Sequence, residues 1–275
     1  MDRKPAVAGS FYPAGHNELE ALIGKCMNGA SVDKEAVASA SSYVAPHAGY
    51  VYSGPIAAYT YKALSLKAHL DRIDTFVVVG PNHTGYGTLI SVSGVGWITP
   101  LGKVWNDTEF AKEVAKIHGI EIDESAHRYE HSVEVQLPFL QAVIEKPRCV
   151  FVCMGDQSDE SSELLSRAIN EAEKNLGRTI AVIASSDFNH YESAEVAKGK
   201  DMPAIKALET LDVPGFYRQI RANEDSACGY GPIATAALYA KSHGAKSGRL
   251  LRYATSGDTT GDYRSVVAYA SMIFH

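Results

Sequence analysis

The sequence predicts an α/β fold, with a central mixed, partly parallel sheet flanked by helices. Short runs of consecutive apolar residues, typical of strands covered on both faces, alternate with stretches whose apolar residues recur at helical spacing. No low-complexity segment, charge block or Pro/Ser-rich linker divides the 275 residues, and no internal repeat recurs at a fixed period. A chain of this length can bury one large core, so we expect a single domain over residues 1–275.

The expected strands are the apolar runs. Residues 75–80 read TFVVVG, a β-branched run that ends at Pro81, and residues 179–185 read TIAVIAS. Near-continuous runs of this length fit strands that lie between two layers of helices. The full set of expected strands is 41–45, 75–80, 88–93, 149–155, 179–185, 250–255 and 265–274.

The expected helices are recognised by their periodicity and by the residues at their ends. Asp107 is a typical N-cap for a helix that carries Phe110, Val114 and Ile117 and ends at Gly119. A proline inside a helix bends it or marks its first turn, so Pro138 should do one or the other. The expected helices cover 19–29, 107–119, 131–145, 164–177 and 231–244.

Composition and charge exclude several functional classes. The 26 basic and 32 acidic residues give a net charge of −6, which argues against binding to nucleic acid or to an anionic membrane. No run of 18 apolar residues is present, and the first residues lack the apolar segment of a secretory signal. The four cysteines are too few for a disulfide framework. We therefore expect a cytoplasmic protein.

Three histidines follow three of the expected strands. His47, His83 and His190 each lie in a turn rich in Gly, Pro, Asn or Asp, just past the carboxyl end of a strand. Sites in α/β proteins form at this edge of the sheet. Imidazoles that converge from different loops can form a metal site or an acid–base site. The alternative is that all three are turn histidines exposed to water.

A cysteine forms a fourth candidate. Cys228 lies in the segment ACGYGP, just before an Ala-rich helical stretch. A position near a helix N-terminus lowers the pKa of a thiol and favours the thiolate, so Cys228 is a candidate metal ligand or nucleophile. The alternative is a small buried apolar residue, which is the interpretation we give to Cys26, Cys149 and Cys153.

A fifth candidate segment is HRYEHSVE, residues 127–134. His127 and His131 are four residues apart and would share a helix face if the helix began this early. The glutamate directly precedes His131, so the segment does not match the zinc-protease motif. We expect the two histidines to line the pocket; the alternative is a solvated helix start. The chain has no dinucleotide fingerprint, no phosphate-binding loop and no nucleophile elbow.

Taken in order, these segments resemble the Memo family, whose bacterial and archaeal members are named for the AmmeMemoRadiSam system, as its protein B. The similarity covers nearly the whole chain. The segments that carry it are RKPAVAGSFYP (3–13), APHAGYVYSG (45–54), GPNHT (80–84), EHSVEVQLPF (130–139), SSDFNHY (185–191) and CGYGP (228–232).

The resemblance implies a fold similar to class III extradiol ring-cleaving dioxygenases, which are non-haem iron(II) enzymes. By motif, His47 and His83 match two metal ligands, Cys228 matches the third, and His190 matches the acid–base histidine. The dioxygenases use a carboxylate where this chain has Cys228. Two imidazoles and a thiolate form a softer site, which suits iron, copper or zinc.

The hypothesis that follows is a metal-dependent oxidoreductase with Fe²⁺ as the first choice of metal and copper or zinc as the others. His190 would move a proton, Asp187 would orient His190 or a water, and Tyr50 and His131 would line the cleft for a small molecule or a peptide. One alternative is a non-catalytic scaffold that acts with radical-SAM and AMMECR-type partners. Another is a metal buffer that sequesters copper.

Overall fold

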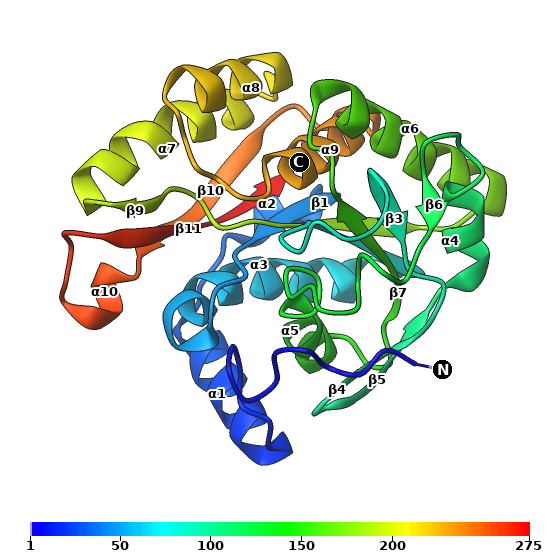
Figure 1. The fold of residues 1–275 in the computed structure, drawn as a ribbon, viewed down its shortest axis with the longest axis horizontal. Helices are drawn as coiled ribbons and strands as arrows, with labels where there is room; N and C mark the ends of the chain where they lie inside the picture. The colour runs from blue at the N-terminus through cyan, green and yellow to red at the C-terminus, as the bar shows by residue number, and fades with distance from the viewer. Residues whose placement is uncertain (1) are drawn as a thin grey trace.

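A mixed sheet of eleven strands forms the centre of this computed structural model, which describes residues 2–275 (Figure 1). The strands are β1 (Ser42–Ala45), β2 (Thr75–Pro81), β3 (Ile90–Val92), β4 (Trp97–Thr99), β5 (Gly102–Asn106), β6 (Glu121–Ile122), β7 (Arg148–Met154), β8 (Ile180–Ser185), β9 (His190–Glu192), β10 (Gly248–Thr255) and β11 (Val266–Phe274). The main path is β10–β11–β1–β8–β2–β7–β3–β6. Strands β1, β8, β2 and β7 pair in parallel, whereas β11 and β3 join this group antiparallel. The predicted α/β class with a mixed, partly parallel sheet is therefore confirmed.

All seven predicted strands are present. The central and C-terminal runs correspond to β1, β2, β7, β8, β10 and β11, and the run 88–93 contains the shorter β3. The sequence did not predict the β4–β5 hairpin, β6 or β9. These strands have only two to five residues each and lack a continuous apolar run that would mark them.

Helices cover both faces of the sheet (Figure 1). They are α1 (His16–Gly29), α2 (Lys34–Ala38), α3 (Tyr50–Leu70), α4 (Thr108–Val114), α5 (Gln136–Val143), α6 (Asp159–Leu176), α7 (Ala194–Glu209), α8 (Val213–Ala222), α9 (Tyr230–Ser242) and α10 (Gly257–Thr260). In Figure 1, α1, α3 and α5 lie below the sheet, and α6 to α9 lie above it. None of the helices in the described chain combines the length and hydrophobicity that a bilayer span needs.

Alternate residues of each central strand face two separate cores. On β2, Val77 and Val79 belong to the core shared with α6 and α9, whereas Phe76 and Val78 belong to the core shared with α3 and α5. Successive side chains of a strand point to opposite faces. A strand buried on both faces is therefore apolar throughout, and this explains why the central strands could be recognised in the sequence.

The helix predictions need three corrections. The helix predicted over 107–119 ends at Val114, so Ile117 and Gly119 lie in the turns that follow α4. The predicted helix 131–145 begins only at Gln136, so His131 lies in the turns before α5, and Pro138 is in the first turn of the helix, where proline is tolerated. Helices α3, α7 and α8 were not predicted. Helix α3 has apolar residues at both exposed and buried positions and lacks the distinct polar face that makes a helix recognisable from its periodicity.

Candidate metal centre

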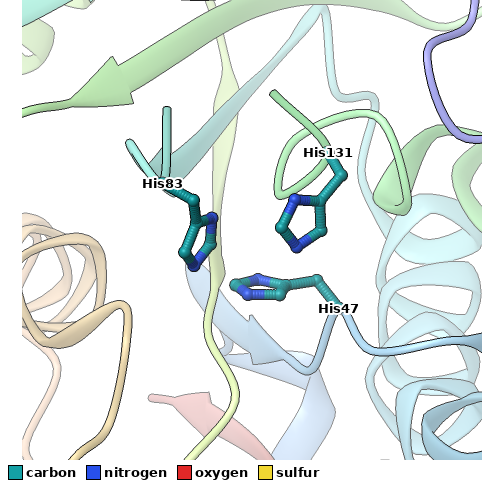
Figure 2. Close-up of side chains that lie close together, drawn as sticks. All are labelled: His47, His83 and His131. Atoms are coloured by element: carbon teal, nitrogen blue, oxygen red, sulfur yellow. The ribbon is translucent and has the colours of Figure 1, made fainter. Parts of the chain in front are cut away.

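Three histidines from three loops converge at the carboxyl edge of the parallel strands. His47 follows β1, His83 follows β2, and His131 lies just before α5. One nitrogen from each ring lies within 4.8 Å of the chosen nitrogens of the other two rings. Figure 2 shows the three rings facing one another across a small space. Nitrogen ligands at such spacing can hold a metal ion.

The end of β8 orients His47. Ala45 of β1 pairs with Ser185 of β8, so the residues that follow the two strands are neighbours. The His47 backbone N–H donates to Asp187 Oδ1 at 2.8 Å, and His47 Nδ1 lies 2.8 Å from Ser185 Oγ.

The hydrogen bonds of Ser185 determine which nitrogen of His47 carries the proton. Its hydroxyl donates to the Ser132 carbonyl at 2.6 Å, so its oxygen can only accept from the other neighbours. His47 Nδ1 must then carry the hydrogen and donate to Ser185. The lone pair of His47 Nε2 is therefore left free for a metal.

Glu130 orients the other two histidines. This buried carboxylate accepts hydrogen bonds from the backbone N–H groups of His83 (2.6 Å), His131 (2.8 Å) and Ser132 (2.9 Å). His83 Nδ1 lies 2.9 Å from Glu130 Oε1, and His131 Nδ1 lies 3.3 Å from the same oxygen. Burial alone would raise the pKa of Glu130, but the hydrogen bonds and the two imidazoles hold it below its usual range.

The pair of Glu130 and His83 matches a common arrangement at metal sites. A ligating histidine usually donates its second ring N–H to a carboxylate, which fixes the tautomer and leaves the other nitrogen for the metal. Sequence reasoning used this glutamate only to reject a protease motif. Glu130 directly precedes His131 in the segment EHSVEVQLPF, which resembles the Memo family. This position was the signal that could have identified Glu130 as part of the site.

Burial keeps His47 and His131 of the cluster neutral. Burial lowers the pKa of His131 to about 4, and the pKa of His47 falls well below its ordinary value for the same reason. The neighbouring imidazoles act in the same direction, because a second positive charge nearby would be unfavourable. Only neutral imidazole can ligate a metal, so these two rings are ready to do so at neutral pH.

Cys228 lies beside the cluster. Its Sγ is 3.1 Å from His47 Nε2, and its backbone N–H donates to the Asp187 carbonyl at 3.2 Å. The predicted lowering of its thiol pKa is wrong for the metal-free site, because burial raises that pKa and the nearby Asp187 adds to the effect. Its place as a metal ligand stays a prediction.

Asp187 lies on the loop that follows β8, and His190 begins β9 at the end of that loop. The backbone N–H of His190 donates to Ser226 Oγ at 2.8 Å, and its Nδ1 lies 3.1 Å from the Ser226 carbonyl. A carbonyl can only accept, so Nδ1 carries the hydrogen and Nε2 is free. Burial lowers the pKa of His190, so its ring is neutral near pH 7.

Asp187 supports the His47 loop. Its carboxylate accepts hydrogen bonds from the backbone N–H groups of His47 and Ala48. Burial raises its pKa to about 7, which allows it to hold or release a proton near neutral pH. Its predicted role of orienting His190 or a water stays a prediction.

Two other candidates lie in the core. Tyr50 is 1% exposed, and its hydroxyl donates to the Val135 carbonyl at 2.6 Å. Its part in binding substrate stays a prediction. His127 was expected in the pocket wall, but it is fully buried against Trp97, with ring centroids 5.5 Å apart. The reason is that the segment 127–135 forms turns instead of the helix that would have placed His127 and His131 on one face.

The N-terminal segment secures this loop. The Arg3 guanidinium donates to the carbonyls of His127 and Glu130, both at 2.6 Å, and pairs with Glu134 at 2.7 Å. It also lies 4.0 Å above the Trp97 ring. Sequence reasoning missed this contact, because Arg3 and Glu130 are far apart in the chain.

Comparison with known proteins identifies the family. The model of the Memo-like protein family matches residues 3–273. The chain belongs to this family. Memo-like relatives include MEMO1 family proteins from Archaeoglobus fulgidus, 45% identical over 99% of both chains, and from Methanococcoides burtonii, 44% identical over 98% of this chain and 99% of the relative. An uncharacterized protein from Escherichia coli K12, known from a crystal structure, is 15% identical, with a TM-score of 0.48 over 85% of this chain and 99% of its own.

Proposed function

We propose that this Memo-like protein is a metal-dependent oxidoreductase, with Fe²⁺ held by His47, His83 and Cys228. The observation that carries the proposal is the convergence of His47, His83 and His131 at one edge of the sheet. The hydrogen bonds of Ser185 and Glu130 support it, because they direct an unprotonated nitrogen of His47 and of His83 away from their protein partners.

The distance between Cys228 and His47 supports the third ligand. Thiolate and imidazole are both common metal ligands, and two ligands of one ion must lie close together. The observed separation of Sγ and Nε2 is 3.1 Å. Binding of an ion would also favour the thiolate over the thiol that burial favours in the metal-free site. His131 is the competing third ligand, and the variants below decide between the two.

The surrounding residues would handle substrate and protons. Bound iron would supply the means to activate oxygen or to exchange electrons. His190, with its free Nε2, would take a proton from a bound small aromatic molecule or a peptide and return it. Asp187 would hold the His47 loop in place and supply a second group that titrates near neutral pH.

A second candidate is a metal carrier without turnover. The observation in its favour is the Cys228 thiol next to His47, because a thiolate with imidazoles also suits Cu(I) or Zn²⁺. Such a carrier would act in the cytoplasm, where all four cysteines stay free, with radical-SAM and AMMECR-type proteins as proposed partners.

Metal content tests the site. Protein purified without an affinity tag is reconstituted anaerobically with Fe²⁺, and bound iron is measured after desalting. We expect about one iron per chain, lost in His83→Ala and retained in His118→Ala, an exposed histidine that serves as the control. Cys228→Ser and His131→Ala then identify the third ligand. A wild-type chain that stays metal-free after reconstitution overturns the proposal.

Oxygen uptake tests the reaction. The iron-loaded protein is surveyed in an oxygen electrode with catechols and other small aromatic compounds. Uptake that disappears in His190→Ala while the iron content stays unchanged supports an oxidoreductase and contradicts a pure carrier. Tight Cu(I) binding with no oxygen uptake in the survey favours the carrier.

A further inference from the structure

A cleft separate from the histidine cluster lies between α1 and α3 on one side and β10 and α10 on the other. Its volume is about 670 Å³. Ligand pockets of proteins usually measure about 300–1,000 Å³, so the cleft has room for a small organic molecule.

The α3 side of the cleft is apolar and aromatic. Ile56 and Tyr59 line it, together with Val51 and Tyr52 from the first turn of the helix. Val51 is 62% exposed and Tyr52 is 40% exposed, so part of this apolar surface is open to solvent. Large apolar side chains that gather around a concave surface mark a binding site more often than the same residues scattered singly.

Two cationic side chains line the same cleft. Lys25 comes from α1 and Arg252 from β10, and within residues 2–275 neither forms an ion pair or a side-chain hydrogen bond. The Arg252 guanidinium lies 6.0 Å from the Tyr59 ring centroid, a contact that leaves its N–H groups available. Two unpaired cations in one cleft of a chain of net charge −6 favour an anionic ligand.

The one acidic residue in the lining is already engaged. Asp258 accepts a hydrogen bond from the Thr255 backbone N–H at 2.7 Å, and the Tyr263 hydroxyl donates to it at 3.4 Å. These hydrogen bonds hold its carboxylate in the turn at α10, and Asp258 forms no ion pair with Lys25 or Arg252. With two cations and one carboxylate, the lining carries one net positive charge.

We propose that this cleft binds a small organic anion with an aromatic or branched apolar body. The acidic group pairs with Lys25 and Arg252, and the apolar body packs on Ile56, Tyr52 and Tyr59. This site is distinct from the histidine cluster and does not depend on the function proposed for that cluster.

The test measures binding of 2-naphthoate by equilibrium dialysis against the full-length protein, with uncharged 2-naphthamide as the matched probe. We expect the wild type to bind the carboxylate at least tenfold more tightly than the amide. The double variant Lys25→Gln/Arg252→Gln should lose that preference and keep its weak amide binding, which also reports that the cleft is intact. The control is Lys112→Gln. Lys112 is an exposed lysine on α4 that does not line the cleft, so this variant should bind the carboxylate as the wild type does.

A further variant separates this cleft from the metal centre. His83→Ala should bind 2-naphthoate with unchanged affinity, with and without chelator. Binding that disappears in His83→Ala places the carboxylate at the histidine cluster and overturns the proposal. Equal affinity for the two probes, or an affinity unchanged in Lys25→Gln/Arg252→Gln, also overturns it.

Discussion

At the scale of single residues, Glu130 links two of the three clustered histidines. One carboxylate accepts from the backbone of His83, His131 and Ser132 and also contacts both imidazole rings. A buried carboxylate with this many donors is fully compensated for its desolvation. Glu130 therefore holds the two candidate ligands His83 and His131 in fixed positions.

We expect Glu130→Gln to weaken metal binding by about 10- to 100-fold, the usual cost of losing the carboxylate behind a ligating histidine. The amide keeps the shape of the side chain, but it loses the charge and presents N–H groups to backbone donors. Affinity is measured by competition with a chelator of known strength. Glu121→Gln, an exposed glutamate on β6, is the matched control. An affinity equal to that of the wild type would show that Glu130 serves folding only.

His127 predicts a dependence of stability on pH. Burial lowers its pKa to about 3, and neither ring nitrogen has a well-formed hydrogen bond. Between pH 6.5 and 3 the unfolded chain therefore binds a proton that the folded chain does not bind. Acidification through this range should reduce the free energy of unfolding by about 1.4 kcal/mol per pH unit from this residue alone.

The comparison with His127→Leu isolates that contribution. His131 destabilises the fold in acid in the same direction, whereas the raised pKa of Asp187 acts in the opposite direction between about pH 4 and 7. Both groups are present in both proteins, so they cancel in the difference. Urea unfolding of the metal-free proteins at pH 7, 6 and 5 gives the measurement. A difference that does not change with pH contradicts a buried neutral His127.

At the scale of the elements, the ends of the parallel strands could be predicted from the sequence and the turns between them could not. His47 and His83 were recognised because an apolar run followed by a proline turn marks the end of a strand. The segment 127–135 offers no such marker. Arg3 fixes its path through hydrogen bonds to carbonyls more than 120 positions away, and Glu130 fixes it through a bond to the adjacent His131 backbone. The sequence predicted that His131 lines the cleft, but the turn that brings it there had to come from the structure.

The missed helices differ in the signals that they carry. Helix α8 has an apolar and a polar face and an Asp212 N-cap, so its sequence could have been recognised as helical. Helix α3 carries apolar residues such as Val51 and Leu70 at exposed positions as well as at buried ones, so it lacks the contrast between apolar and polar faces that periodicity detects. Two predicted helix caps are confirmed, because a cap depends on residues that are close together in the chain. The Asp107 side chain accepts from the Phe110 N–H, and Gly177 adopts the left-handed conformation after α6.

The contact between β2 and the His131 turn gives a prediction for Gly80. A Cβ at this position would overlap the Ser132 side chain and lie 3.0 Å from Val133 Cγ2. Gly80 shortly precedes the turn that carries His83, and Ser132 directly follows His131. Gly80→Ala should therefore force the two candidate ligands apart and lower metal affinity by tenfold or more.

A second substitution separates this geometric effect from a general loss of stability. Ser132→Gly removes the side chain that the added methyl group of Gly80→Ala would meet, so the double variant should recover much of the lost affinity. The Ser132 backbone, which accepts from Ser185 and donates to Glu130, stays in place. Affinity that stays low in the double variant, when Ser132→Gly alone binds as the wild type does, would contradict this account.

At the scale of the whole molecule, the candidate ligands come from segments that pack on both faces of the sheet, against its two hydrophobic cores. His47 and His83 follow central strands of the sheet, His131 precedes α5 on one face, and Cys228 precedes α9 on the other. A ligand that binds only the folded state stabilises all of these connections together. The cluster should therefore couple metal binding to the stability of the entire fold.

Thermal unfolding with Zn²⁺, a redox-inert probe, tests that coupling. At a free concentration 100 times the Kd, one bound ion adds about 2.7 kcal/mol to the free energy of unfolding. For a chain of this size that corresponds to a rise in Tm of about 5 °C over protein in chelator. His118→Ala should show the same rise, whereas His47→Ala should show almost none, because it removes the ligand closest to Cys228. A rise that persists in His47→Ala would mean that the ion stabilises the protein from another site, and the histidine cluster would then not be the metal centre.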